Sequence, residues 1–264
     1  MRGLLFAAAW LASASALAAE ARDLCPDRPG LGTPACTAER GTAVFEIGLA
    51  DWTGDRQPGL HSEQFLFGDA LLRYGLTDTL EAQLGWTAFG RVRERDTRTG
   101  TTGRASRFGD LSLALRRNLR NPDGSGLSLA LMPYVNLPSG RAPVGAEDWS
   151  AGISLPIGIE LGAVSLGLTP NIEAAVDSDG NGRHLAYGAV AGLGFDVSDT
   201  VSGTFEVSLS RDRDPDGHAT EALAGLSFGW QPGEDAQWDA GINAGLNDHS
   251  PDLQIYVGYA KRFR

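Results

Sequence analysis

Hydrophobic and polar residues alternate along most of the chain from Thr42 onward, in segments of roughly ten residues. No segment keeps the 3.6-residue period of an amphipathic helix. Residues that favour turns, chiefly Gly, Pro, Asn, Asp and Ser, separate the segments. The pattern therefore predicts an all-β protein of twelve strands, near residues 42–51, 63–74, 79–91, 107–118, 126–137, 147–160, 163–175, 184–196, 200–211, 218–230, 236–247 and 252–263.

The alternation gives each strand two chemically different faces. In the segment 200–211, Phe205 and Val207 share one face while Thr204 and Glu206 share the other. A soluble β-sandwich alternates in the same way, with its apolar face turned inward. Alternation alone therefore leaves a sandwich and a membrane barrel both open.

The connections between the predicted strands favour an up-and-down transmembrane β-barrel. Long, charged connections alternate with short turns along the chain, as expected for an outer-membrane barrel with an even number of strands. The long connections are 51–62, 92–106, 138–146, 176–183 and 212–217, and the short ones include 75–78, 161–162 and 197–199. We therefore place the short turns on the periplasmic side.

Aromatic residues of the apolar face then fall at one rim of this barrel. Tyr74, Phe195, Trp230 and Phe263 end their strands there, and Trp238 begins its strand at the same rim. Amphipathic rings gather at membrane interfaces, whereas a sandwich core would not collect them at one end. The aromatic positions therefore also favour the barrel.

The second face carries small residues and many acids, and we expect it to line a wet lumen in which the acids are solvated. Unpaired carboxylates would be prohibitive in a dry core. The acids in this phase are Glu46, Glu63, Asp69, Glu81, Asp110, Asp148, Glu160, Glu173, Glu206, Glu221 and Asp239, and the bases are Arg73, Arg91, Arg116 and Arg262. The aromatic residues in this phase are Phe65, Phe67, Phe89, Tyr134 and Tyr256, which either form an apolar track or occlude the lumen.

Two segments precede the barrel. Residues 1–19 combine Arg2, an apolar run and the small-residue sequence Ala16-Leu17-Ala18, as in a cleaved secretory signal. Residues 20–41 form a Pro/Gly-rich leader whose Cys25 and Cys36 we expect to form a disulfide in an exported compartment. This leader either caps or enters the periplasmic mouth, or it stays a solvated tail.

Composition narrows the possible partners. The 264 residues include 22 Lys+Arg and 33 Asp+Glu, and the net charge of −11 argues against a nucleic-acid partner. Beyond residues 1–19, no apolar run approaches the roughly 20 residues of a spanning helix. A mean hydropathy of −0.15 is then the average of a lipid face and a lumen face.

Four segments carry a family resemblance: Phe67–Asp78, Phe108–Leu111, Pro133–Gly140 and Tyr256–Phe263. With them the chain resembles the meta-pathway phenol-degradation outer-membrane proteins, a family described as transporters. The resemblance implies a Gram-negative outer-membrane barrel that passes small solutes, aromatic or hydrophobic compounds among them.

Two acidic turns match the first half of a calcium loop, D-x-D-x-[DN]-G. They are Asp177, Asp179 and Asn181 in one turn, and Asp212, Asp214 and Asp216 in the other. Both lack the bidentate acid that closes such a loop, and Asp, Asn and Gly are also ordinary hairpin-turn residues. We favour turns over a calcium site and predict no metal and no cofactor.

Enzymatic alternatives have little support. A barrel hydrolase needs a serine within reach of a histidine base, and His61-Ser62 and His249-Ser250 are the adjacent pairs. Neighbours in a strand point to opposite faces, so we predict no catalytic residue.

The sequence thus predicts a monomeric barrel in contact with outer-membrane lipid, for passive or facilitated passage of small solutes through an acidic, cation-favouring lumen. The alternative is a non-conducting structural or surface-interaction barrel.

Overall fold

The structure, a computed structural model, describes residues 22–180 and 182–264. The predicted signal, residues 1–19, lies outside the described residues. Within them the chain is all-β, and no helix is long and apolar enough to cross a membrane.

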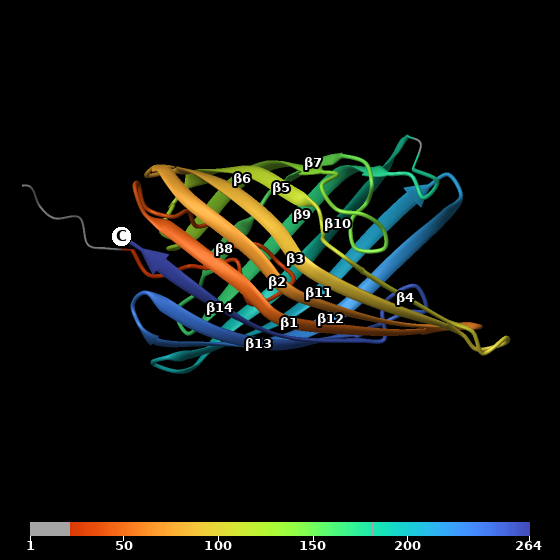
Figure 1. Cartoon of the computed structure of the whole chain (residues 1–264). Helices are drawn as coiled ribbons and strands as arrows, with labels where there is room; N and C mark the ends of the chain where they lie inside the picture. The colour runs from red at the N-terminus through yellow and green to blue at the C-terminus, as the bar shows by residue number, and fades with distance from the viewer. Residues whose placement is uncertain (1–21, 181) are drawn as a thin grey trace, which may run out of the picture.

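The strands form a closed antiparallel barrel, as predicted (Figure 1). β4 and β5 are two parts of one crossing of the wall, and β7 and β8 are two parts of another, so fourteen strands make twelve crossings. β14 pairs with β1 and closes the barrel. The strands are β1 (Ala43–Gln57), β2 (Leu60–Thr77), β3 (Leu80–Asp96), β4 (Thr102–Arg107), β5 (Leu111–Arg120), β6 (Leu127–Leu137), β7 (Ser150–Ser154), β8 (Ile157–Glu160), β9 (Val164–Val176), β10 (Arg183–Ser198), β11 (Val201–Asp214), β12 (Gly217–Gly233), β13 (Ala236–Gly245) and β14 (Leu253–Phe263).

Two of the predicted long loops are largely strand. The connection predicted at 51–62 reduces to the turn around Gly59 (φ 94°), because β1 and β2 pair up to Gln57 and Leu60. The connection predicted at 92–106 is shortened in the same way, because β3 pairs with β4. Polar alternation suits a ladder that projects into water, where neither face needs to be apolar. These two hairpins reach furthest at this end of the barrel, and the tip of the β11–β12 hairpin ends close behind them (Figure 1).

The alternation of faces slips by one residue across β1, β2 and β3. The register of β1 against β14 shifts between Gly48 and Ala50, and Gly68 of β2 has φ 66°. Such bulges change which side chains face inward. In β1, the even-numbered residues Glu46 and Gly48 point inward before the slip. After it the odd-numbered Asp51 points inward.

Burial is inverted relative to a soluble protein. The largest fully buried side chains include Glu46, Arg73, Glu81 and Arg116, while large apolar side chains such as Leu113 and Ile242 are exposed. An apolar outside and a polar inside suit a barrel in lipid.

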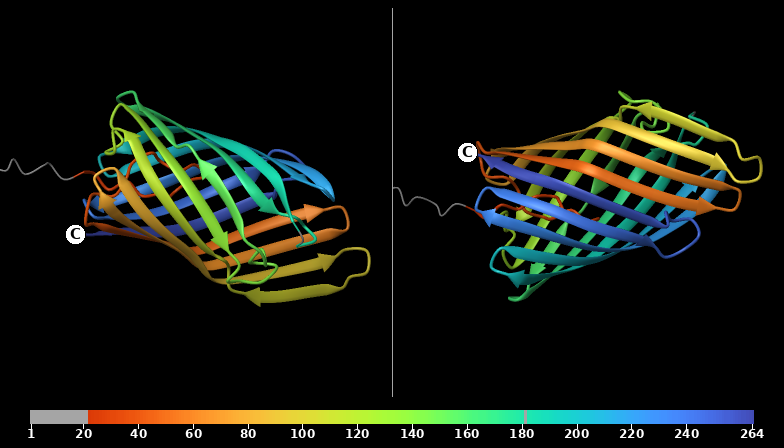
Figure 2. Two further views of the ribbon diagram at one scale, coloured as in Figure 1. Left: turned by 90° about the horizontal axis from the view of Figure 1, so that it is seen from above. Right: turned by 60° about the horizontal axis from the view of Figure 1, so that its bottom comes forward.

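The leader, residues 22–41, lies inside the barrel at the end that carries the short turns (Figure 2). Its Cys25 and Cys36 form the predicted disulfide, with Cα atoms 6.5 Å apart. Leu24 and Ala38 of the leader pack with Val44 of β1 in a small apolar cluster.

Candidate functional site

A buried cluster of charges joins the leader to one side of the barrel wall. Arg73 of β2 contacts Glu46 at 3.2 Å and Glu81 at 2.9 Å, and Arg116 of β5 lies 3.4 Å from Glu81. The leader inserts Asp27 between the two arginines, with its oxygens 2.9 Å from Arg73 and 2.5 Å from Arg116. The cluster therefore has three carboxylates and two guanidiniums, and one of the carboxylates comes from the leader.

Backbone groups of the leader complete the hydrogen bonding of this cluster. The amides of Asp27 and Arg28 each donate to Glu46 at 2.9 Å, and the amide of Ala38 donates to Glu81 at 2.6 Å. Buried carboxylates need such donors, because an unpaired buried charge is costly. Glu46 and Glu81 therefore depend on the leader for part of their hydrogen bonding, in addition to the bonds they accept from Arg73.

The electrostatics of Asp27 favour its charged form. Burial acts to raise the pKa of its carboxyl, but the guanidiniums of Arg116 and Arg73 outweigh burial and hold the pKa below its usual range. Asp27 is therefore a charged anchor of the leader at neutral pH.

The opposite wall holds the tip of the leader through Glu206 of β11. Glu206 accepts hydrogen bonds from the amides of Leu31 at 2.6 Å and Gly32 at 2.9 Å. Gly30 has φ 122°, and a Cβ there would lie 2.5 Å from a carboxylate oxygen of Glu206. Only glycine allows the backbone to approach this carboxylate so closely.

Arg28 fixes the leader to a third part of the wall. Its guanidinium lies 3.1 Å from Asp239 of β13 and 5.4 Å from the ring centre of Tyr256 on β14. The side chain of Gln237 donates to the Arg28 carbonyl at 2.8 Å. Cation–π and charge contacts of this kind are strong when little water is present.

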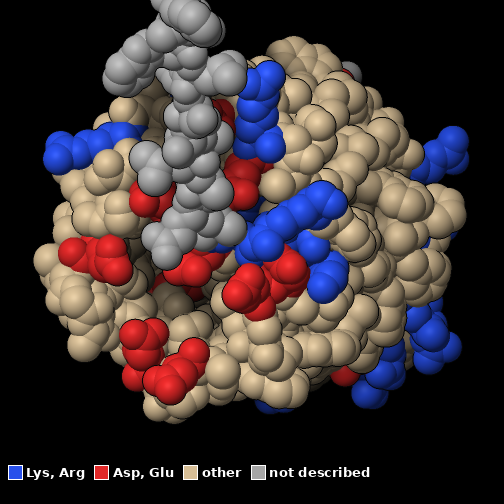
Figure 3. All heavy atoms as spheres, turned by 90° about the vertical axis from the view of Figure 1, so that its left-hand side faces the viewer, with Lys and Arg blue, Asp and Glu red and all other residues tan. Residues whose placement is uncertain are grey.

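The leader therefore bridges the lumen from β2 and β5 to β11 and β13, which resolves whether it enters the barrel or stays solvated. It also corrects our expectation that the lumen acids are solvated, since Glu46, Glu81, Glu206 and Asp239 are buried and paired. Acidic and basic side chains gather at this end of the barrel (Figure 3). The prediction left open whether the leader enters the barrel, and it did not identify Asp27 and Arg28 as partners of the wall.

Other predicted lumen residues make contacts among themselves or with loops. Tyr134 donates to Glu173 at 2.9 Å, and Thr87 donates to Asp69 at 2.8 Å. Asp110 accepts from the amides of Gly140 and Ala146, so it holds the connection between β6 and β7. Asp148 pairs with Arg183, Glu160 accepts from Gly126, Glu221 lies opposite Ser210, and Arg262 pairs with Asp235.

Five predicted lumen residues lie on the outer face because of the slip in alternation. Phe65 pairs with Trp52, which pairs with Ile255, and Ile255 faces away from the buried Tyr256. Directly opposed residues share a face. The same reasoning places the whole set outside: Glu63, Phe65, Phe67, Phe89 and Arg91. A continuous apolar track through the lumen is therefore not formed by these phenylalanines.

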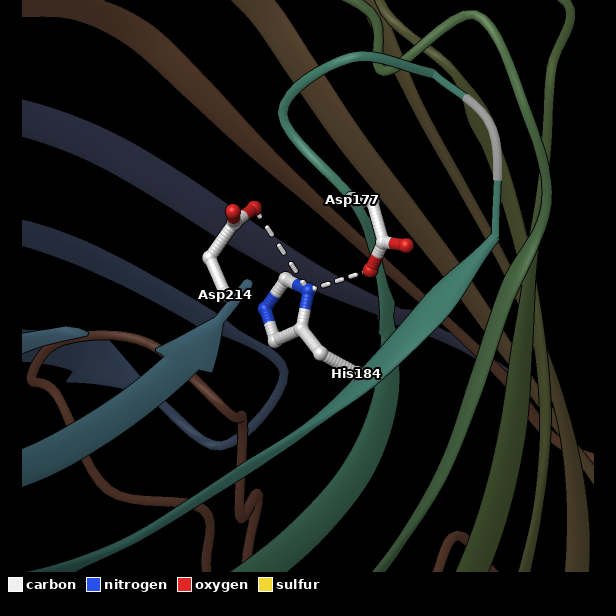
Figure 4. A group of neighbouring side chains, drawn as sticks. All are labelled: Asp177, His184 and Asp214. Carbon is white, nitrogen blue, oxygen red and sulfur yellow. Dashed lines mark hydrogen bonds and ion pairs between the residues drawn. The ribbon is translucent and has the colours of Figure 1, made fainter. Parts of the chain in front are cut away.

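A second cluster lies at the opposite rim, where the two acidic turns meet (Figure 4). His184 of β10 places Nδ1 2.9 Å from Asp177 and 3.6 Å from Asp214, and Nε2 2.8 Å from Asp212. Asp177, His184 and Asp214 could together offer three donors to a metal ion. Calcium prefers oxygen ligands alone, and the imidazole occupies the middle of this group.

The two turns are therefore joined through His184 rather than each forming a calcium loop of its own. Ser178 also donates from its amide to Asp214 at 2.6 Å, and Asp216 lies 3.2 Å from the Ser178 hydroxyl. Of the other predicted calcium-loop residues, Asn181 lies outside the described residues. Asp179 makes at least one polar or electrostatic interaction. Hairpin structure accounts for the contacts of this cluster.

Neither His-Ser pair is arranged for catalysis. His61 and Ser62 are neighbours in β2 and point to opposite faces. The buried Ser250 hydroxyl is bonded to the Ala222 carbonyl at 2.9 Å and the Asn247 side chain at 2.7 Å.

Comparisons with known proteins place this geometry in context. A family model described as "Putative MetA-pathway of phenol degradation" matches residues 26–263. No curated protein sequence matches the chain.

Several solved barrels are similar in fold. The translocator domain of the autotransporter NalP from Neisseria meningitidis is 16% identical over 86% of this chain and 90% of its own, with a TM-score of 0.52. The transport unit of the autotransporter AIDA-I from Escherichia coli is 9% identical over 86% and 91%, with a TM-score of 0.51. The NanC porin is 8% identical over 80% and 98%, with a TM-score of 0.50. At these identities the likeness shows the outer-membrane barrel fold alone.

Proposed function

Because the chain belongs to this phenol-degradation family, we propose that it is a monomeric channel of the Gram-negative outer membrane for passive or facilitated passage of small solutes. Aromatic and hydrophobic compounds are the solute class that the family suggests. The observation that carries the proposal is the polar lumen enclosed by an apolar outer wall.

The position of the leader decides whether a solute can pass through the lumen. It is held by hydrogen bonds and ion pairs to several strands, and its disulfide links it only to itself. Polar contacts of this kind can exchange with water, so a solute passes when the leader shifts within the lumen or leaves it. We propose that the docked leader is the closed state.

The wall charge suggests which ions pass. Asp51, Asp69 and Glu173 face the lumen, and they accept hydrogen bonds from Gln254, Thr87 and Tyr134, which carry no charge at neutral pH. Arg28 of the leader lies near Asp51 and Asp69 while the leader is docked. Carboxylates in a narrow channel favour cations and repel anions, and Asp51 and Asp69 lose the charge of Arg28 when the leader leaves. We therefore propose a cation-selective channel without covalent chemistry.

A second candidate, a non-conducting structural barrel, is favoured by one observation. Arg73 and Arg116 pair with Glu46, Glu81 and Asp27 inside the lumen, and such buried pairs can hold a barrel shut. In this case the leader would never leave.

Planar-bilayer conductance and liposome swelling distinguish the two candidates. We expect cation-selective conductance and swelling with at least one class in a panel of phenols, aromatic acids, sugars and amino acids. Anion selectivity would contradict the charge argument, and no conductance and no swelling under any condition would support the structural barrel.

A further inference from the structure

Six basic side chains gather on the outer surface of the two long hairpins formed by β1 to β4. They are Arg56, His61, Arg91, Arg93, Arg95 and Arg104, and we call them the basic patch. The chain as a whole is strongly acidic, with a net charge of −11. A concentration of bases on one outer surface therefore runs against the general charge of the protein.

The strand register shows that the basic patch faces outward. Arg91 is opposite Phe65, which belongs to the outward row with Trp52 and Ile255. Alternation along β3 then puts Arg93 and Arg95 on the same face as Arg91, while the buried Val92 faces inward.

The basic patch lies just beyond the apolar part of the wall that faces the lipid acyl chains. The hairpins project from the rim opposite the docked leader, which is the extracellular rim of a barrel with short periplasmic turns. Moving outward along β2, the exposed Phe67 and Phe65 come first, then Glu63 and His61. Aromatic rings at the level of the headgroups are typical of outer-membrane barrels. The arginines therefore lie at the depth of the polar headgroups of the outer leaflet.

Bases stand directly opposite one another within the basic patch. Arg93 is paired with Arg104 across β3 and β4, and Arg56, His61 and Arg95 form one row across β1, β2 and β3. Like charges directly opposite in a sheet destabilise it unless an anion lies between them. Acidic neighbours offset only part of this charge: Glu63 lies 3.0 Å from Arg93, and Asp252 lies 3.9 Å from Arg56.

Beside these rows the surface forms a hollow of about 440 Å³. Its charged lining consists of Arg56, Arg93 and Arg95 with the acids Asp55, Glu63 and Asp252, and Trp52 and His61 also line it. Guanidiniums bind phosphate through paired, charge-assisted hydrogen bonds, and an indole suits the boundary between lipid and water. We propose that the basic patch binds the phosphate groups of a phosphorylated glycolipid in the outer leaflet. The lipid would neutralise the opposed arginines while its acyl chains lie along the apolar wall below.

This site goes beyond transport and depends only on placement in the outer membrane. The test uses the folded, full-length protein in detergent, with diphosphoryl lipid A, its dephosphorylated form and inorganic phosphate as separate probes. Binding is measured by native mass spectrometry or calorimetry. The Arg93→Gln/Arg104→Gln variant tests the opposed pair. The matched control, Arg117→Gln/Arg120→Gln, removes two exposed arginines at the other rim.

We expect the Arg93→Gln/Arg104→Gln variant to bind diphosphoryl lipid A at least about ten-fold more weakly, and the control variant to bind like wild type. Binding should also weaken as salt is raised. Equal affinity for the dephosphorylated lipid, or unchanged binding by the Arg93→Gln/Arg104→Gln variant, would overturn the proposal. Binding of inorganic phosphate as tight as that of the lipid would replace the lipid by the free ion. Heat modifiability on gels checks that each variant is folded, and an Arg95→Gln variant repeats the test if the double variant is not.

Discussion

The exchange Asp27→Asn tests whether the leader is held in the lumen by charge. The substitution keeps the size of the side chain and removes the negative charge that lies 2.9 Å from Arg73 and 2.5 Å from Arg116. Removing one partner of a buried ion pair costs about 3 to 5 kcal/mol, because the remaining charges lose their compensation. In this cluster Glu46 and Glu81 stay beside the arginines, so we expect the lower end, about 3 kcal/mol.

A change of about 3 kcal/mol shifts the docking equilibrium of the leader by roughly two orders of magnitude. Hydrogen exchange reads this directly, because the amides of Leu31 and Gly32 are protected by Glu206 only while the leader is docked. In Asp27→Asn these amides should exchange about a hundred-fold faster, while those of β12 keep their wild-type rate. Channel conductance should rise in parallel.

The matched control is Asp96→Asn, which removes an acid at the opposite rim that bonds the amides of Arg98 and Thr99. It should leave leader exchange unchanged. Wild-type exchange rates at Leu31 and Gly32 in Asp27→Asn would refute the view that charge holds the leader. Faster exchange without any gain in conductance would instead show that the leader is not what closes the barrel.

The remaining predictions concern acid pH, the disulfide, the leader glycines and the second cluster. The pKa of Asp27 is lowered on docking, so its contribution is present above its ordinary pKa of 3.8 and is lost as pH falls through the docked value. The protection of the leader amides, taken relative to their intrinsic exchange rate at the same pH, should therefore fall below about pH 3.8 in wild type. An equal fall in Asp27→Asn would contradict this. Replacing both Cys25 and Cys36 by Ser should lower the stability of the docked leader by about 2 to 4 kcal/mol, visible as faster exchange of residues 22–41, and unchanged exchange would mean that the wall contacts alone suffice. Gly30→Ala should loosen the leader tip, because its Cβ would lie 2.5 Å from Glu206 and its φ is 122°, whereas Gly103→Ala, which meets no atom within 4 Å, should not affect it in the same exchange experiment. His184→Gln should speed hydrogen exchange in the 176–183 connection, because His184 contacts Asp177 and Asp212. Calcium titration should leave the melting temperature of the wild-type protein unchanged. A calcium-dependent rise in that temperature would favour the calcium-loop hypothesis instead.

The barrel itself could be predicted from the sequence because its signals are local. A two-residue period, turn residues at regular spacing and alternating connection lengths report the environment of each strand separately. They predicted the twelve crossings that the barrel has. In the structure Glu46, Arg73 and Glu206 are buried on its inner side.

The slip at Gly68 was not readable in this way. A glycine inside a strand can mark a bulge, but 35 glycines are spread over this chain and the sequence does not show which of them adopts a positive φ. An unrecognised bulge reverses the inward and outward assignments on one side of it, and the neighbouring strands follow because directly opposed residues share a face. For this reason Phe65 of β2 and Arg91 of β3, predicted in the lumen, both lie outside.

The sequence by itself determined a barrel with an apolar outside, a polar inside and a disulfide-closed leader before it. Only the tertiary structure decided that this leader enters the lumen and contacts its acids. The contacts responsible join residues far apart in sequence, such as Asp27 with Arg116, separated by 89 positions, and Leu31 with Glu206, separated by 175. No local pattern encodes such pairs, because they come into being when barrel closure brings the inner faces of distant strands around the same leader.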